Sequence, residues 1–197
     1  MISSKTLSAA LARIASHTEA ASEELCSADG ALGDGDLGIT VSKGFAEAAA
    51  TDLPEDIGMA LLAIAKAFQR VSSSSYGTLL ATGFMAAAKM EKGKTKIDPA
   101  GIPGLVAAAR DAMMARGKGH LGDKTVLDSL DAVANALDHA PLEEMINVAI
   151  AAAAETAEQY RGKPNKLGRA RMFGERSIGL LDPGQLAFLR IVEALRA

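Results

Sequence analysis

Cysteine and aromatic residues are scarce in this chain. Its 197 residues include one cysteine, Cys26, no tryptophan, two tyrosines and five phenylalanines. A single cysteine cannot form an intrachain disulfide, and together with three histidines it offers no zinc-binding set. The few aromatic rings leave little surface on which nucleic-acid bases could stack. The sequence therefore excludes a disulfide-stabilised domain and argues against a structural zinc site.

A large excess of either charge is also lacking. Lys and Arg number 21 against 24 Asp and Glu, a formal net charge of −3, so no broadly basic surface is available for nucleic acid. The longest uninterrupted apolar runs, such as Val148–Ala154, are far shorter than the ~20 residues that span a bilayer. Residues Met1–Lys5 lack the basic and apolar regions of a signal peptide. We therefore expect a soluble cytoplasmic protein that binds neither nucleic acid nor membrane.

Helical spacing dominates the apolar positions, and alanine makes up about a fifth of the chain, as in closely packed helices. We predict an all-α protein with eight helices, at 3–27, 37–50, 55–71, 77–91, 99–116, 123–138, 141–160 and 183–196. Asp98-Pro99 and Asp182-Pro183 are typical of an N-cap followed by proline in the first turn. Residues 1–197 contain no long linker and are expected to form a single domain.

The connections after alternate helices are unusual in composition. Those after the first, third, fifth and seventh helices are rich in glycine, serine or charge, and they cover 29–36, 72–77, 117–123 and 161–182. The other connections are ordinary, which favours antiparallel neighbours in an up-and-down bundle or barrel. In that arrangement the four unusual connections lie at one end. We therefore expect a functional site in the loops at that end.

Asp29, Asp34 and Asp36 are the first candidates for that site. Three carboxylates so close in sequence repel one another unless a cation holds them, and oxygen ligands of this kind suit Mg²⁺ or Ca²⁺. Their spacing does not fit an EF-hand. A solvated turn with helix caps is the alternative interpretation.

The same stretch matches the G-x-G-x-x-G pattern of dinucleotide-binding loops at 33–38. A Rossmann fold is excluded because a helix, not a strand, precedes the pattern. Two aspartates would repel a bare pyrophosphate, whereas a bridging metal ion turns the repulsion into attraction. A metal-bridged phosphate is therefore favoured over a dinucleotide fold.

Two further connections each allow a binding role and an ordinary one. Gly117–Thr125 is similar to a phosphate-binding P-loop, but Asp123 interrupts the pattern. A glycine-rich loop that leads into a helix can still meet an anion, and Asp123 as a plain N-cap beside an exposed Lys124 is equally compatible. The serine run Ser72–Ser75 offers hydroxyls to a phosphate, although by itself it favours a turn that caps the next helix.

The last unusual connection is basic. Between Arg161 and Arg176 it carries six Lys and Arg side chains against the single acid Glu175. These side chains bind phosphates or an acidic partner, or they form a solvated surface. Acid, glycine, hydroxyl and base at one end of a bundle fit a Mg-nucleotide site, because phosphoryl transfer needs mainly positioning and charge neutralisation.

With these motifs in their order, the chain resembles the DhaL family, the nucleotide-binding subunits of dihydroxyacetone kinases. The resemblance is carried by phrases along nearly the whole chain: Asp29-x4-Asp34-Gly35-Asp36, Arg116-Gly117-Lys118, Gly122-Asp123-Lys124-Thr125 with Asp128, Gly168-Arg169-Ala170, Gly174–Gly179 and Asp182-Pro183-Gly184. It implies an eight-helix up-and-down barrel with the nucleotide bound at one end.

The resemblance also implies ligands for ADP or ATP and for two Mg²⁺ ions. Asp29, Asp34 and Asp36 match the aspartates that hold the metal ions on the diphosphate. No catalytic residue beyond these metal ligands is implied. Positions that match contacts to the phosphates or elsewhere around the nucleotide are Leu37, Gly38, Ile39, Thr40, Ser75, Tyr76, Gly117, Val126, Arg169, Asp182, Pro183 and Gly184.

Three departures from the family pattern cluster at the phosphate end. Leu37 stands where the family usually carries histidine, Ser73-Ser74 replace the glycines of a Gly-Gly-x-Ser-Gly loop, and Tyr76 replaces its serine. They remove a polar group near the metal and glycines that let a phosphate approach the backbone. The departures indicate a different sugar, such as a tetrulose, or weakened nucleotide binding.

Two functions follow as hypotheses. In the first, the chain is the nucleotide-binding phosphotransfer subunit of a dihydroxyacetone-type kinase, active only with a DhaK-like subunit that holds a small ketose. Its phosphoryl donor is then free ATP, or a phosphotransferase subunit recharges a bound nucleotide, and a homodimer is a further assembly to consider. In the second, the chain is a non-catalytic regulatory or interaction protein with a degenerate nucleotide site.

Overall fold

The computed structural model describes residues 1–71 and 74–196, and most of these are helical. The α-helices are α1 (Ser4–Ala20), α2 (Ser22–Leu32), α3 (Leu37–Ala49), α4 (Ile57–Val71), α5 (Ser75–Met90), α6 (Ile102–Gly117), α7 (Val126–Leu137), α8 (Met145–Arg161) and α9 (Pro183–Glu193). Short 3-10 helices are η1 (Pro99–Gly101), η2 (Leu142–Glu144) and η3 (Ala170–Ser177). Two-residue strands β1 (Ile2–Ser3) and β2 (Lys96–Ile97) pair antiparallel. The predicted all-α class is confirmed.

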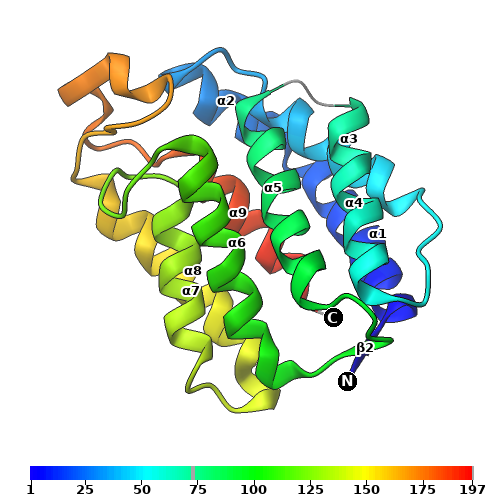
Figure 1. The fold of residues 1–197 in the computed structure, drawn as a ribbon. Coiled ribbons are helices and arrows are strands. Elements are labelled where there is room, and N and C mark those ends of the chain that lie inside the picture. The colour runs from blue at the N-terminus through cyan, green and yellow to red at the C-terminus, as the bar shows by residue number, and fades with distance from the viewer. Residues whose placement is uncertain (72–73, 197) are drawn as a thin grey trace.

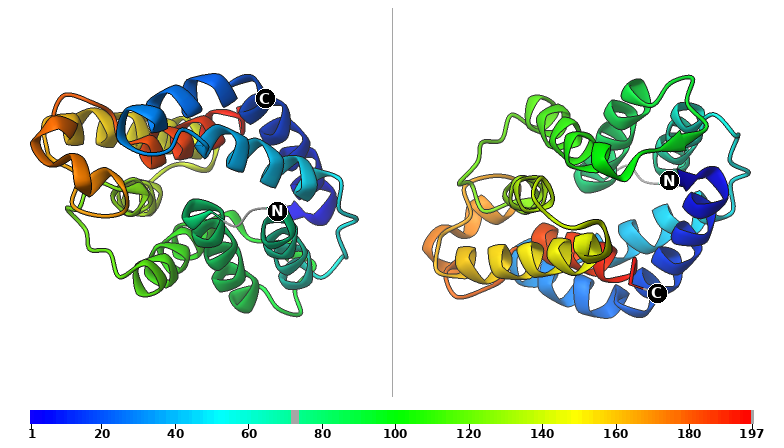
Figure 2. Two further views of the ribbon diagram at one scale, coloured as in Figure 1. Left: turned by 90° about the horizontal axis from the view of Figure 1, so that it is seen from above. Right: turned by 90° about the horizontal axis from the view of Figure 1, so that it is seen from below.

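The α-helices form a ring in which neighbours in sequence are also neighbours in space. Figure 1 shows the chain running up and down, and Figure 2 shows the ring from its two ends. Each helix from α2 to α8 packs against the next, and α9 closes the ring against α1 and α2. Helices α2, α4, α6 and α8 therefore end on the same side of the molecule, at the top of Figure 1.

The first predicted helix, 3–27, is observed as two. Helices α1 and α2 meet at Ala21, whose ψ of 0° departs from the helical value and turns the axis. Helix α2 then continues to Leu32, beyond the predicted end, so that Asp29 belongs to its last turn and not to a loop. Together the two helices occupy the place of one in the ring, which keeps the up-and-down order.

Helix caps fix several of the other boundaries. Asp182 is the N-cap of α9, and its side chain accepts a hydrogen bond from the N–H of Gln185, as the Asp182-Pro183 pair predicted. Asp98 likewise accepts a hydrogen bond from the N–H of Ala100, but it caps η1, and α6 begins three residues later than predicted. The predicted start of α7 at Asp123 is wrong, because Thr125 is its N-cap.

Apolar side chains from the inner helix faces fill the ring. Phe45 of α3 and Phe68 of α4 meet edge to face, with ring centroids 4.9 Å apart, and Phe68 stacks on Phe84 of α5 at 5.9 Å. Many of the remaining core positions are alanine, which keeps the packed helices close together. Across 1–71 and 74–196, no helix combines the length and the apolar character needed to cross a membrane.

The crossing of α2 and α3 depends on a glycine and gives the first prediction. A Cβ at Gly38 would overlap the carbonyl oxygen of Ser22 and lie 2.9 Å from Sγ of Cys26. Because helix backbone cannot move aside cheaply, we expect Gly38→Ala to lower the free energy of unfolding by about 1–3 kcal/mol. Urea denaturation measures this change.

Gly101→Ala is the matched control. A Cβ at Gly101 would meet nothing within 4 Å, so its effect should stay within about 0.5 kcal/mol. Equal midpoints for Gly38→Ala and the wild type would show that the two helices do not need this close approach.

Candidate functional site

A cleft of about 890 Å³ lies at the end of the ring where the four unusual connections were expected to meet. Its volume falls within the range of roughly 300–1,000 Å³ that is typical of ligand pockets. Residues from all four connections, or directly beside them, line it: Asp29, Asp34, Asp36 and Leu37 at the first, Ser74–Tyr76 at the second, Arg116, Gly117 and Thr125–Leu127 at the third, Leu167–Met172 and Asp182–Gly184 at the fourth. The predicted convergence of the four connections is confirmed.

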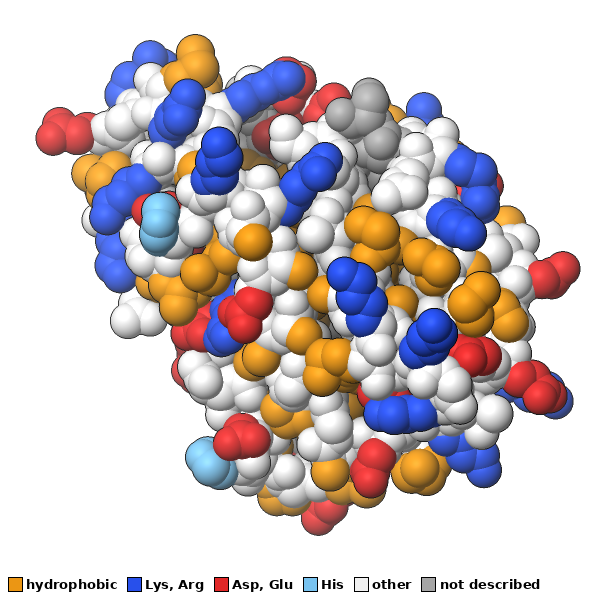
Figure 3. Space-filling view, in the orientation of Figure 1, with side chains coloured by type: hydrophobic (Ala, Val, Ile, Leu, Met, Phe, Trp, Pro, Cys, Tyr) orange, Lys and Arg blue, Asp and Glu red, His pale blue; other side chains and the backbone are white. Residues whose placement is uncertain are grey.

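Four helices begin at this cleft. The first residues of α3, α5, α7 and α9 all line it, namely Leu37, Ser75, Val126 and Pro183. First-turn N–H groups have no carbonyl partner within their own helix, and a helix N-terminus carries a partial positive charge. Arg116, Arg169 and Arg171 add full positive charges to the lining. In Figure 3, Lys and Arg side chains gather over the top left, where the fourth connection lies. These groups together attract an anion such as a phosphate.

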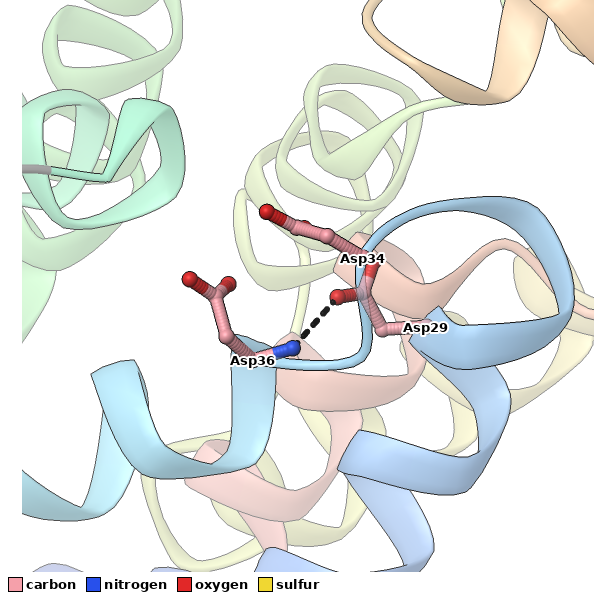
Figure 4. A group of neighbouring side chains, drawn as sticks. All are labelled: Asp29, Asp34 and Asp36. Atoms are coloured by element: carbon pink, nitrogen blue, oxygen red, sulfur yellow. Dashed lines mark hydrogen bonds between the residues drawn. The ribbon is translucent and has the colours of Figure 1, made fainter.

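Asp29, Asp34 and Asp36 lie together at one rim of the cleft (Figure 4). Asp29 comes from the last turn of α2, Asp34 from the connection, and Asp36 directly precedes α3. One carboxylate oxygen from each lies within 4.8 Å of the others. Within 1–71 and 74–196, this is the one group of three or more His, Cys, Asp or Glu side chains arranged in this way.

Asp29 also shapes the connection that carries the other two aspartates. Its Oδ2 accepts hydrogen bonds from the N–H groups of Gly35, Asp36 and Leu37, at 2.9, 3.0 and 3.3 Å. Gly35 adopts a φ of 78°, a left-handed conformation that favours glycine. Burial raises the pKa of the Asp29 carboxyl, and the three N–H donors act in the opposite direction. The bonds use Oδ2, so Oδ1 is the further oxygen that Asp29 has to offer a cation.

The donor set of this cluster fits a hard divalent cation. Mg²⁺ and Ca²⁺ prefer carboxylate oxygens, and Asp34 and Asp36 are exposed enough to reach a bound ion. Arg169 of the basic connection already forms an ion pair with Asp34. The metal-binding role expected for the three aspartates therefore agrees with their chemistry and stays a prediction.

Three residues expected at the phosphates do not line the cleft as the described residues form it. Gly38 and Thr40 are buried, and Ile39 is exposed to solvent. Only Leu37, their neighbour at the start of α3, is part of the lining. The close contact between α2 and α3 explains glycine at position 38 without a ligand. Contacts from these three residues to a phosphate stay predictions that rest on the resemblance.

The serine connection is described only from Ser74 onward, and Ser72 and Ser73 lie outside the described residues. Ser74 is the N-cap of α5, where its Oγ accepts a hydrogen bond from the N–H of Gly77 at 3.1 Å. Ser75 and Tyr76 both line the cleft. The Tyr76 hydroxyl donates to the carbonyl of Gly184 at 3.0 Å, and burial raises the pKa of this phenol. The capping interpretation of the serine run therefore holds at Ser74.

Lys124 is not the exposed side chain that the ordinary interpretation of this loop expects. It is 0% exposed, and its Nζ donates to backbone carbonyls of the fourth connection, so it is not a free cation for a phosphate. Burial lowers the pKa of its ammonium, while the attraction of Asp182 acts in the opposite direction. Asp123 is not the helix cap, because Thr125 and Asp128 form a capping box at the start of α7. The only sequence signal for Lys124 was its place in the Gly-Asp-Lys-Thr phrase.

The remaining positions expected around a nucleotide all line the cleft: Gly117, Val126, Arg169, Asp182, Pro183 and Gly184. Asp182 is buried, and its two oxygens accept hydrogen bonds from the N–H of Gln185 at 2.9 Å and from the Asn165 amide at 2.7 Å. Burial raises the pKa of the Asp182 carboxyl to about 6, although these donors and Lys124 act to lower it.

The chain is therefore an all-α protein, a closed ring of α-helices in which helix N-termini and an aspartate cluster lie at one cleft. The family pattern described as the DAK2 domain matches residues 31–197. The chain is 32% identical over 177 residues to the ADP-binding subunit DhaL of PEP-dependent dihydroxyacetone kinase 1 from Listeria innocua, which covers 85% of this chain and 82% of that subunit. It is 28% identical over 183 residues to the ADP-binding subunit DhaL from Escherichia coli, with 88% and 87% covered. The chain therefore belongs to the DAK2 domain family.

Longer kinases contain a similar unit. The fold is similar to the crystal structure of the dihydroxyacetone kinase of C. freundii, with a TM-score of 0.75 and 23% identity, over 95% of this chain and 33% of that one. The L-erythrulose 1-kinase of Mycolicibacterium smegmatis is 30% identical over 181 residues, 87% of this chain and 32% of the kinase. The chain thus spans about a third of the length of these kinases, but most of the length of the DhaL subunits.

Asp182 gives a prediction about the pH dependence of stability. Its folded-state pKa of about 6 lies above that of an unfolded aspartate, about 3.9. The folded state therefore favours the protonated carboxyl. The stability that this group contributes is present at low pH and is lost as the pH rises through about 6, by about 3 kcal/mol in total.

Asp182→Asn should remove this loss. Its free energy of unfolding relative to the wild type should rise from about pH 4 to about pH 7, as measured by urea denaturation across that range. Asp138→Asn changes an exposed side chain and should follow the wild-type curve. Parallel curves for Asp182→Asn and the wild type would mean that the buried carboxyl does not titrate as described.

Proposed function

We propose that this chain is the nucleotide-binding subunit of a dihydroxyacetone-type kinase and passes a phosphoryl group from Mg-bound ATP or ADP toward a small ketose. The observation that carries the proposal is the aspartate cluster at the cleft where four helices begin. The helix N-termini and arginines attract an anion, whereas the aspartates repel one unless a cation lies between. A Mg-nucleotide supplies both the cation and the anion. The family relation supports this reading, since two relatives that match over most of their length are named ADP-binding subunits.

In this proposal Asp29, Asp34 and Asp36 hold two Mg²⁺ ions, which supply charge neutralisation for the phosphates. Asp29 fixes the backbone between α2 and α3, so that the carboxylates of Asp34 and Asp36 stay on one side of the connection. Arg169, which pairs with Asp34, lies where it can add positive charge beside the phosphates. The first-turn N–H groups at the cleft orient the nucleotide, and no side chain beyond the metal ligands is assigned to the chemistry.

A separate DhaK-like subunit would hold the ketose, with residues 1–197 working as one domain. The chain matches the DhaL subunits over most of their length and the erythrulose kinases over a third, which supports a division of labour between chains. The names of the relatives include PEP-dependent dihydroxyacetone kinases and kinases of erythrulose. A phosphotransferase subunit and free ATP are accordingly both candidate donors, and a triose and a tetrulose both candidate acceptors.

The proposal predicts Mg-dependent stabilisation by ADP. Protein stripped of nucleotide and given ADP at 100 times its dissociation constant should gain about 2.7 kcal/mol, or roughly 5–10 °C in Tm. The shift should require Mg²⁺, because ADP alone meets the carboxylates. Asp34→Asn should reduce the shift strongly while leaving the ligand-free Tm within about 2 °C, since Asp34 is a partly exposed loop residue.

Asp138→Asn is the matched control and should keep the full shift, because Asp138 is an exposed carboxylate at the end of α7, outside the cleft lining. No shift in folded, nucleotide-free wild type would contradict the proposal and favour the regulatory function. A shift that persists in Asp34→Asn would contradict the metal assignment alone.

A further inference from the structure

One buried ammonium joins both ends of the basic connection to the loop between α6 and α7. Nζ of Lys124 donates to the carbonyl of Lys163 at 2.8 Å, near the start of the connection. It also donates to the carbonyls of Ser177 and Leu180, at 2.9 and 2.8 Å, near its end. Three short bonds match the three N–H donors of an ammonium group. Lys124 itself has a φ of 62°, a left-handed conformation that a non-glycine residue seldom adopts.

Further hydrogen bonds extend this anchor to the start of α9. The Asn165 amide donates to the carbonyl of Lys124 at 2.9 Å and to Asp182 at 2.7 Å. The backbone N–H of Asn165 donates to Oγ of Ser177, which in turn donates to the carbonyl of Gly174. Lys124, Asn165, Ser177 and Asp182 are all buried. The connection is thus held from beneath, on the side away from solvent.

The anchor and the cleft are separate parts of the same connection. Lys124, Asn165 and Ser177 do not line the cleft as the described residues form it, whereas Leu167–Met172 do. Arg169 lies on that stretch and reaches across to pair with Asp34. The position of Arg169 relative to the aspartate cluster therefore depends on how the two ends of the connection are held.

We propose that Lys124 is a positioning residue, whose buried ammonium holds the basic connection so that Arg169 lies against the aspartate cluster. The proposal rests on the proposed function only where it concerns nucleotide affinity. Lys124→Met removes the ammonium at nearly constant length, and the carbonyls of Lys163, Ser177 and Leu180 lose this donor. The connection then loses its anchor, while the ring of helices keeps its core. Lys124 acts through Arg169 and does not touch the ligand.

Hydrogen exchange of the ligand-free protein tests the anchor without reference to a nucleotide. The N–H of Lys166 donates to the carbonyl of Asp123 at 3.0 Å, and that of Gly179 donates to the carbonyl of Arg161 at 2.8 Å. In Lys124→Met, peptides that contain these two amides should exchange at least about tenfold faster, while those of α4 keep their wild-type rates. A general loss of stability would instead raise exchange in α4 as well, and either that result or an unchanged connection would overturn the proposal.

One variant serves as a control for this test, and a second replaces Lys124→Met if that variant does not fold. Lys89→Met removes an exposed lysine of α5 and should leave all rates unchanged. If Lys124→Met does not fold, Asn165→Ala replaces it, since it breaks the link between Lys124 and Asp182 without touching the ammonium. Faster exchange confined to the connection supports the anchor, and wild-type rates there in folded Asn165→Ala count against it.

A double-mutant cycle on Mg-ADP affinity tests whether Lys124 acts through Arg169. Lys124→Met and Arg169→Gln should change the dissociation constant by the same factor, and the double variant should differ by less than about twofold from either alone. A structural effect independent of Arg169 would multiply the two factors and overturn this part of the proposal. If the wild type binds no Mg-ADP, the proposed function fails, whereas the exchange experiment still decides on the anchor.

Discussion

The alternation of chain direction around the ring is the constraint on which the site depends. Because each helix from α2 onward packs against the next and the chain reverses direction between them, α3, α5, α7 and α9 all begin at the same end. Each beginning supplies first-turn N–H groups that have no carbonyl partner in their own helix, together with a partial positive charge. Capping side chains such as Ser74 and Asp182 bind some of these N–H groups. The cleft is therefore a consequence of ring topology first and of sequence motifs second. The connections then vary what the shared end presents: carboxylates in one, hydroxyls in another, guanidinium groups in a third.

The positive and the negative groups at this end of the ring suit a ligand that carries both charges. Helix N-termini and arginines alone would suit a bare anion, and the aspartate cluster alone would suit a bare cation. When both sets lie on one cleft, the aspartates weaken the binding of a bare anion, and the arginines and helix N-termini weaken the binding of a bare cation. Both sets favour binding only when the cation and the anion bind as one complex. The Arg169–Asp34 pair shows how the chain balances these charges internally. A metal–phosphate complex offers the same balance from outside, with the cation on the carboxylates and the anion on the N–H groups.

Much of this arrangement could be predicted because it depends on local properties of the sequence. Helical periodicity gave the elements, and the composition of alternate connections gave their convergence. Lys124 could not be predicted in this way, because its carbonyl partners lie 39, 53 and 56 residues further along the chain. The break at Ala21 was equally hidden, since alanine has the highest helix propensity and does not by itself indicate the end of a helix. The sequence also placed Asp29 in a connection and not in the last turn of α2. The end of α2 depends on how the chain turns at Gly33 and Gly35 toward α3.

Tyr76 lies at the position of the serine in the family's loop, but its hydroxyl proton is used in a bond within the protein. A tyrosine hydroxyl has a single proton to donate, and that of Tyr76 goes to the carbonyl of Gly184 at the start of α9. This bond ties the beginnings of α5 and α9 together across the cleft. A serine at this position is too short to span the same gap. Tyrosine therefore adds a link between α5 and α9, and its hydroxyl proton is not available to a ligand. An anion held here must therefore draw its hydrogen bonds from other groups of the cleft, such as its backbone N–H groups, its arginines and the hydroxyl of Ser75. Recognition of the anion then depends on the helix beginnings and on the connections beside them, and not on Tyr76.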